Sequence, residues 1–478
     1  MDARAPIPAP DALYTPHPAP PPLSVLRASK LRRTLHIFRS ILRTGKNFLN
    51  LYHPEIETNR WLVNYLRGEQ VVSINDAGLA RHVLQTNSDN YVKGRFYEII
   101  FGEFLGKSSL TLEKDAWKQR RRLISPAFNA RAMKGVEGVV TRHVEALVAK
   151  WDAAAETGDE VDLTADAGEL TMRIAMEAFF SADMGADPAR IGRLMEDIIT
   201  FSGSIDMADV LQLPWWVPRR SKTEVRAWMA ELDAWLYALI DQRLADRAAG
   251  EPDSPDLLDI LVHARDEETG ELLDRQAIRN EVLTLFAAGH ETTALSLSWG
   301  LDRLAREPEW QARLAQAARA AQEAAGHPLT VAEAKGETLL AAAYDEILRL
   351  YPPAFSVGRT ALEADRFEDL EIEPGARIQL AIHMIHRNPR YWTDPGKFDP
   401  ARFLAEGRAN RPPFAHMPFG GGPRICVGLA LAKMEGLMAL ARILPRFELE
   451  APGAPPKPLG KITLRTEGPV RLRVRRRT

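Results

Sequence analysis

Residues 419–435, FGGGPRICVGLALAKME, combine a glycine-rich loop, the only cysteine of the chain and the start of an amphipathic helix. Glycines let a backbone approach a flat ligand closely. A helix N-terminus favours anions, so it stabilises the thiolate of Cys426, the form of cysteine that binds metal. A lone cysteine is more often a small apolar core residue. The glycines and the adjacent Arg424 instead indicate a ligand site.

Direct inspection excludes three other chemistries. Residues 290–294, HETTA, begin like a zinc-protease motif, but alanine stands where the second histidine is needed. The glycines before Arg424 lack the last glycine of G-x-G-x-x-G and the Lys-Ser/Thr pair of a phosphate loop. No G-x-S-x-G nucleophile elbow is present. The sequence therefore gives no support to zinc proteolysis, nucleotide binding or hydrolysis of this kind.

The composition is that of a globular protein without a strong charge bias. Of the 478 residues, 45% are hydrophobic and 26% are charged, and 62 basic side chains stand against 64 acidic ones. The net charge of -2 removes the electrostatic argument for a nucleic-acid partner. One cysteine fits a reducing compartment, and neither a signal peptide nor an apolar run of about 18 residues is evident. We therefore expect a cytoplasmic protein that binds no nucleic acid.

The first 50 residues are predicted to lie outside the folded domain. Residues 1–22 are rich in proline, which favours an extended tail. Residues 23–50 carry only positive charges, with apolar residues at helical spacing. Such a helix can lie on an anionic membrane, although a solvated basic face is commoner. We expect a tail, a basic amphipathic segment whose residues 23–48 contact membranes peripherally, and one large domain at 51–478.

Helical periodicity dominates that domain. Apolar residues recur at the spacing of a helix face in 132–156, 166–184, 188–204, 220–248, 274–306, 308–325, 339–351 and 428–444. The clearest strand is 376–384, where apolar residues alternate after a Glu-Pro-Gly turn. These patterns predict a mainly α fold with small β-sheets in a single large domain.

Three motifs, taken in order, carry a family signature. They consist of Glu346 and Arg349 in EILR, Arg402 in FDPARF, and Phe419, Gly420, Gly422, Arg424, Cys426 and Gly428 in the loop. A glutamate and an arginine three residues apart are ordinarily a surface pair. The order and spacing of all three motifs, however, resemble the cytochrome P450 family of heme-thiolate monooxygenases. The resemblance implies the cytochrome P450 fold and a structural role for Glu346, Arg349 and Arg402, although Ala401 and Asn388 replace the family's usual glutamate and aspartate.

The resemblance also implies heme b, iron protoporphyrin IX, with Cys426 as the iron ligand. In this family the thiolate pushes electron density through the iron and favours O–O cleavage. By family position, the other cofactor-binding residues are Trp117, Arg121, Ala288, Arg359, Phe419 and Arg424. Guanidinium groups suit the heme propionates because they are planar and permanently charged. Trp117 has simple core packing as its alternative.

Residues 287–293, AAGHETT, predict an oxygen pocket. Ala288 and Gly289 leave space, and a threonine hydroxyl bonded to the preceding turn can open the helix to water. Glu291 and Thr292 match the family's catalytic acid and alcohol, which deliver protons for oxygen activation. The resemblance therefore implies a monooxygenase. The alternatives are a peroxide-driven peroxygenase or isomerase on the same fold and a non-enzymatic heme sensor.

Substrate and partners are less sharply defined. The family's specificity segments correspond to 96–105, 198–216 and 354–357, whose apolar bias favours hydroxylation or epoxidation of a hydrophobic small molecule, a fatty acid or terpenoid. Lys93 or Arg95 is a candidate anchor for a carboxylate, although solvated surface cations are commoner. The chain ends soon after Cys426, so a ferredoxin or flavodoxin with its reductase is implied. The candidate docking face consists of Lys118, Arg120, Arg122 and Lys433.

Overall fold

The computed structural model describes residues 47–477, with gaps at 53, 67, 182–189, 192–193, 196, 199–219, 248–249, 251–254 and 410. The predicted tail, nearly all of the basic segment and most of 198–216 lie outside the described residues. Membrane contact through residues 23–48 therefore stays a prediction. Among the described helices, none has the length and apolar character needed to cross a membrane.

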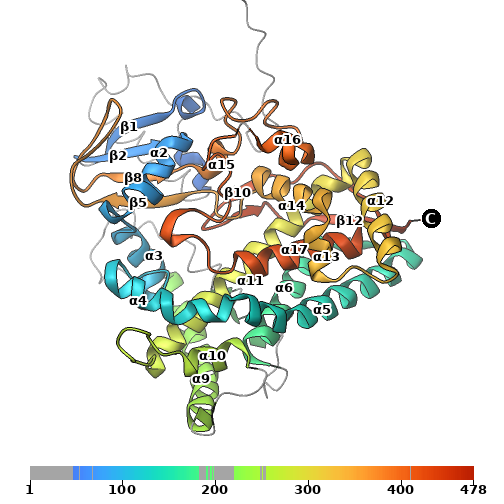
Figure 1. The fold of residues 1–478 in the computed structure, drawn as a ribbon, viewed down its shortest axis with the longest axis horizontal. Coiled ribbons are helices and arrows are strands. Elements are labelled where there is room, and N and C mark those ends of the chain that lie inside the picture. The colour runs from blue at the N-terminus through green and yellow to red at the C-terminus, as the bar shows by residue number, and fades with distance from the viewer. Residues whose placement is uncertain are drawn as a thin grey trace, which may run out of the picture.

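Helices pack around one long central helix, α11 (Arg275–Ala305), which crosses the middle of the molecule in Figure 1. Its main neighbour is α6 (Leu163–Phe180), and most of its own residues are buried. The other helices are α2 (Ala77–Arg81), α3 (Arg95–Leu105), α4 (Lys114–Ile124), α5 (Ala130–Thr157), α9 (Arg220–Asp246), α10 (Leu257–His263), α12 (Pro308–Ala325), α13 (Val331–Gly336), α14 (Thr338–Leu350), α15 (Ile382–Ile385), α16 (Ala405–Arg408) and α17 (Leu429–Ile443). Short single-turn helices connect them: η2 (Phe48–Leu51), η3 (Pro54–Glu57), η4 (His82–Thr86), η5 (Ser88–Asn90), η6 (Ser125–Phe128), η8 (Pro400–Phe403) and η9 (Gly422–Arg424).

Seven of the eight predicted helices are present. The eighth, at 188–204, lies largely outside the described residues, and those of its residues that are described are helical. Side-chain caps fix several of the helix starts, because they satisfy N–H groups that have no partner within the helix. Asn129 caps α5, Asp162 caps α6 and Asp274 caps α11. The mainly α fold with small sheets is confirmed.

The largest sheet forms the corner of the molecule at the upper left of Figure 1. Its strand order is β1 (Trp61–Leu66), β2 (Glu69–Ile74), β8 (Arg377–Leu380), β5 (Val357–Ala361) and β3 (Tyr91–Val92). Among the described strands of this sheet, only β2 and β8 pair in parallel. A second sheet places β12 (Arg471–Arg476) between β4 (Glu160–Asp162) and β9 (Phe447–Glu450), while β6 (Asp365–Phe367) pairs with β7 (Leu370–Ile372) and β10 (Pro458–Gly460) with β11 (Leu464–Thr466).

The strand predicted at 376–384 is too long. β8 ends at Leu380, and Ile382–Ile385 form the short helix α15. The four side chains of α15 are all buried, so no solvent-facing side exists to distinguish a strand from a helix. The apolar alternation at 382 and 384 was therefore compatible with either structure.

A buried ion-pair network joins α14 to the segment around η8. The guanidinium of Arg349 donates to both carboxylate oxygens of Glu346, at 2.6 and 2.8 Å, and neither side chain is exposed. Arg402 lies 3.4 Å from the carboxylate of Glu346. The Asp399 N–H donates to the same carboxylate at 2.8 Å. The three residues with a predicted structural role are thus brought together.

The two departures from the family pattern occupy hydrogen-bonded turns. Asn388 donates from Nδ2 to the Asn75 carbonyl at 2.9 Å and accepts from the Arg390 N–H at 3.0 Å. The Ala401 N–H donates to the Asp399 side chain, which caps η8. Neither replacement disturbs the pairing of Glu346 with its arginines.

Candidate active site

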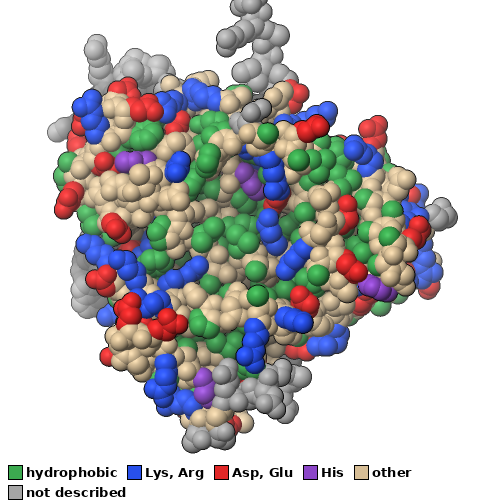
Figure 2. Space-filling view, in the orientation of Figure 1, with side chains coloured by type: hydrophobic (Ala, Val, Ile, Leu, Met, Phe, Trp, Pro, Cys, Tyr) green, Lys and Arg blue, Asp and Glu red, His purple; other side chains and the backbone are tan. Residues whose placement is uncertain are grey.

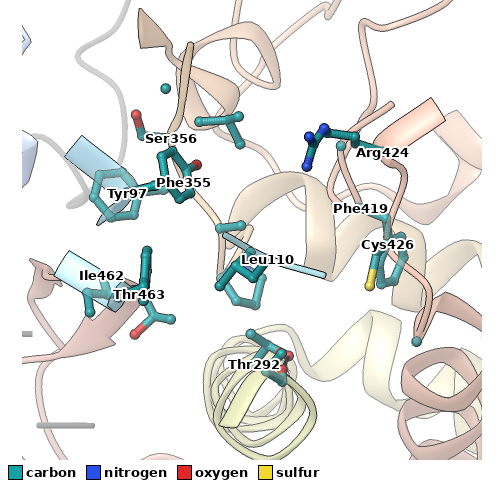
Figure 3. A pocket seen from close by; sticks show the side chains of 18 of the residues that line it. Tyr97, Leu110, Thr292, Phe355, Ser356, Phe419, Arg424, Cys426, Ile462 and Thr463 are labelled. Atoms are coloured by element: carbon teal, nitrogen blue, oxygen red, sulfur yellow. Dashed lines mark hydrogen bonds between the residues drawn. The ribbon is translucent and has the colours of Figure 1, made fainter. Parts of the chain in front are cut away.

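A cavity of about 920 Å³ lies between α11 and the loop before α17. This volume is at the upper end of the usual range for small-molecule sites. Figure 3 shows Thr292 on one side of the cavity and Phe419, Arg424 and Cys426 on another. Most of the remaining lining is apolar. The cavity therefore has room for a large flat group together with a hydrophobic ligand.

The thiol of Cys426 is exposed to this cavity, although it lies deep in the protein. The Cys426 N–H donates to the Phe419 carbonyl at 3.0 Å, which fixes the turn that presents the sulfur. Burial raises the pKa of the thiol, while the N–H groups of Gly428 and Leu429 and the charge of Arg121 oppose this rise. N–H dipoles at the start of α17 and a cation from α4 thus act on the sulfur, as a thiolate ligand needs.

The loop glycines have two different tasks. Gly420 has a φ of 71° and lines the cavity, with no atom within 4 Å of the place a Cβ would take. Gly422 has a φ of 66°, and a Cβ there would lie 1.8 Å from the Leu84 carbonyl oxygen. The predicted close approach to a ligand is therefore available at Gly420, whereas Gly422 is required by packing against η4.

Three cations gather at one end of the cavity: Lys93, Arg359 and Arg424. Burial lowers the pKa of Lys93 well below its usual value, and the charges of the two arginines lower it further. Burial likewise lowers the pKa of Arg424 to about 10, although this arginine pairs with Glu113. Its Nη1 is buried without a partner among the described residues. A ligand with two carboxylates, such as heme with its propionates, fits this excess of positive charge.

Trp117 and Arg121 support the site from α4 without lining the cavity. The guanidinium of Arg424 lies 4.3 Å from the centre of the Trp117 ring, a cation–π contact. Arg121 is close enough to Cys426 for their charges to interact. Their places indicate that Trp117 orients Arg424 and that Arg121 favours the thiolate.

The face of α11 that lines the cavity, across from the Cys426 loop, carries Ala288, Gly289, Glu291 and Thr292. Thr292 Oγ1 donates to the Ala288 carbonyl at 2.8 Å, the back-bond predicted to open this helix. Glu291 accepts from Thr463 at 2.9 Å and pairs with Arg465 at 2.5 Å. Nothing in the sequence indicated these two partners, because more than 170 positions separate them from Glu291.

Residues from two of the predicted specificity segments line the cavity. From α3 these are Tyr97, Phe101, Phe104 and Leu105, and residues 354–357 follow α14. Lys93 belongs to the cationic end and donates to the Leu110 carbonyl at 2.5 Å, and its role as a carboxylate anchor stays a prediction. The side chains of 95, 96, 99 and 100 and most of 198–216 lie outside the described residues.

The predicted docking face contains acidic as well as basic side chains. Each of its four cations has an acidic neighbour: Lys118 with Asp115, Arg120 with Glu281, Arg122 with Asp266, and Lys433 with Asp345. Figure 2 shows basic and acidic side chains interspersed on the face that carries α4 and α17. The net positive charge of this face is therefore smaller than the sequence suggested.

Glu435 on α17 is a cavity residue that the sequence analysis missed. It is 3% exposed, and its Oε2 has no partner among the described residues. Burial raises the pKa of Glu435 to about 8, although a hydrogen bond with Thr293 acts to lower it. A single carboxylate inside the apolar run LALAKMEGLMALARI was the signal that could have revealed it. Glu435 is consequently a neutral acid at pH 7.

We expect Glu435→Gln to flatten the pH dependence of stability. A carboxyl group whose pKa is raised by folding holds a proton that the unfolded chain releases. Its contribution therefore falls as pH rises from about 4.5 to about 8, by up to about 1.4 kcal/mol per pH unit. Urea unfolding of the holoprotein from pH 5 to 9 measures this slope. Glu406→Gln on exposed α16 should keep the wild-type slope, and an unchanged slope in Glu435→Gln would contradict the assignment.

A loop cysteine that is exposed to a large cavity with a cationic end, and that faces a long helix across it, is the arrangement of a heme-thiolate protein. The family model described as cytochrome P450 matches residues 40–473, and the chain belongs to this family. The protein is thus a monooxygenase, an oxidoreductase, and it binds heme b. When bound, heme supplies the redox chemistry of oxygen activation.

Individual relatives agree with this assignment. Putative cytochrome P450 135B1 of Mycobacterium bovis is 32% identical over 386 residues, which cover 79% of this chain and 76% of that protein. Cyclooctatin synthase of Streptomyces melanosporofaciens is 30% identical over 374 residues, which cover 77% of this chain and 78% of that protein. The crystal structure of the cytochrome P450DA heme domain matches with a TM-score of 0.77 and 25% identity, covering 98% and 97%.

Proposed function

We propose that this monooxygenase hydroxylates or epoxidises a hydrophobic small molecule of the fatty acid or terpenoid class, with Glu291 and Thr292 delivering the protons. The observation that carries this proposal is their shared place on α11, facing a mostly apolar cavity that also exposes Cys426. The name of one relative, cyclooctatin synthase, supports a hydrophobic small-molecule substrate.

The Thr292 hydroxyl donates to the Ala288 carbonyl, so its lone pairs are free to accept from water in the cavity. Glu291, one residue away, can exchange protons with that water. Neither side chain binds the iron. Their task is to hold and move protons on the side of the cavity opposite Cys426.

We expect Thr292→Ala to keep heme and substrate binding while product per reduced nicotinamide falls about a hundredfold, at the low end of general acid contributions. Hydrogen peroxide should replace the missing product, because electrons are still consumed when proton delivery fails. Product made from added hydrogen peroxide should suffer less. Product, peroxide and nicotinamide are measured in the same reaction.

Ser298→Ala is the matched control, since Ser298 makes the same back-bond to Ala294 on α11 but does not line the cavity. It should retain wild-type coupling. Wild-type coupling in Thr292→Ala would instead refute the proton role and favour a peroxide-driven or isomerising enzyme.

Electrons would come from a ferredoxin or flavodoxin with its reductase. The face over α4 and α17 supports this, because it lies on the thiol side of the cavity and offers Lys118 and partly exposed Lys433 and Arg122. Since acidic neighbours reduce its charge, the association should depend only modestly on salt.

A further inference from the structure

The β10–β11 hairpin reaches the cavity at its turn. The Lys461 N–H donates to the Thr463 carbonyl at 2.9 Å, which closes the turn tightly. Lys461, Ile462 and Thr463 all line the cavity. Figure 3 shows Ile462 and Thr463 across the cavity from Cys426, near Tyr97. The hairpin is therefore part of the wall that a bound substrate would meet.

The same hairpin holds the carboxylate of Glu291. Thr463 Oγ1 donates to Glu291 Oε1 at 2.9 Å, and Arg465 Nη2 lies 2.5 Å from that oxygen. Both contacts fall on Oε1. Glu291 Oε2 makes no recorded hydrogen bond or ion pair with the described residues, and the side chain is 14% exposed where it lines the cavity.

The charges around this pair leave Arg465 as the main compensating cation. His290 precedes Glu291, and burial lowers its pKa to about 4, so this imidazole is neutral at pH 7. Burial also lowers the pKa of Lys461, and the charge of Arg465 lowers it further. Arg465 itself comes from β11, where it makes the direct contact with the acid.

We propose that Arg465 and Thr463 are positioning residues that clamp Oε1 of Glu291 and leave Oε2 as the oxygen that exchanges protons with the cavity. This inference rests on the proposed relay by Glu291 and Thr292. A glutamate has three rotatable bonds, and proton transfer requires its oxygen within hydrogen-bond reach of the acceptor. The charge-assisted contact with Arg465, together with the hydrogen bond from the Thr463 hydroxyl, selects one orientation of the Glu291 carboxylate.

The first test measures the pair itself, without turnover. Melting temperatures of ferric holoprotein are compared for wild type, Glu291→Gln, Arg465→Gln and the double variant. The two single effects should not add, because either substitution breaks the same contact. Additive effects would overturn the clamp. Arg473→Gln is the control, because Arg473 lies on β12 and pairs with Glu160 at 3.0 Å, not with Glu291. Its effect on the melting temperature should add to that of Glu291→Gln.

The second test measures coupling in the reconstituted holoenzyme, with dodecanoic acid or geraniol as the probe, whichever shifts the heme spin state. Arg465→Gln should lower product per reduced nicotinamide about tenfold and raise the solvent deuterium isotope effect on product formation. Arg465→Lys should restore part of the coupling. Thr463→Val, which keeps the shape but loses the donor, should have a smaller effect in the same direction.

The Glu291→Gln background separates the two levels of the proposal. There, Arg465→Gln should cause little further loss of coupling. An equal loss in both backgrounds, or no loss in the wild-type background, would overturn the clamp alone. Unchanged coupling in Glu291→Gln itself would instead overturn the relay on which the clamp rests.

Discussion

Cys426→Ser is expected to abolish the thiolate signature in the carbon monoxide spectrum of the reduced protein. Serine keeps the size of the side chain and the N–H bond to the Phe419 carbonyl, so the loop can retain its shape. Its oxygen is a harder and more basic donor, and it stays protonated where a cysteine can ionise. The dipoles of Gly428 and Leu429 and the charge of Arg121 are too weak to overcome that difference.

Ile425→Ala provides the control, because Ile425 precedes the cysteine in the same loop and is 39% exposed. It should retain the full spectrum. Cys426 is the only cysteine in the sequence, so its replacement leaves no other thiol to bind the iron. A thiolate spectrum that persists in Cys426→Ser would therefore contradict the assignment of Cys426 as the iron ligand.

Glu346→Ala should destabilise the protein by about 3–5 kcal/mol and leave little heme-loaded material. The substitution leaves the fully buried Arg349 without its carboxylate and removes the acceptor of the Asp399 N–H. Three backbone carbonyls still accept from Arg349, but they carry no compensating charge. Urea unfolding and the ratio of heme to protein measure the two effects.

The neighbouring Asp345→Asn is the matched control. Asp345 pairs with Arg408 and Lys433, which are 56% and 35% exposed, so water can solvate the freed cations. We expect a loss of at most about 1 kcal/mol there. If Glu346→Ala lowered the free energy of unfolding no more than Asp345→Asn does, the buried network would not stabilise the protein more than an exposed ion pair.

Local patterns predicted the helices and the two ends of the active site. The helices at 274–306 and 428–444 were recognisable because each buries a broad apolar face and ends near a cap or a turn. For the helices, the information needed is contained in a short stretch of chain. The loop around Cys426 and the Glu346 network were recognisable because the order and spacing of their motifs resemble a known family, since Arg402 lies more than 50 positions after Arg349.

Contacts between distant segments were not predictable in this way. Arg465 and Thr463 meet Glu291 only because β10–β11 folds back onto α11. Trp117 has the family spacing, yet its place under Arg424 depends on how α4 packs beside the loop. Glu435 looked like one polar residue of an amphipathic helix, and only the packing of α17 against its neighbours makes it a buried cavity acid.

The position of β12 bears on when this protein can finish folding. Residues 471–476 form the middle strand between β4 and β9, so neither neighbour has its full set of backbone hydrogen bonds before these residues are available. During synthesis the N-terminal β4 must wait for a partner more than 300 positions downstream. α6 begins directly after β4 and packs along α11. The helix that carries Glu291 therefore gains its complete support only after residues 471–476 have been synthesised, and a growing polypeptide would have to remain unaggregated until then.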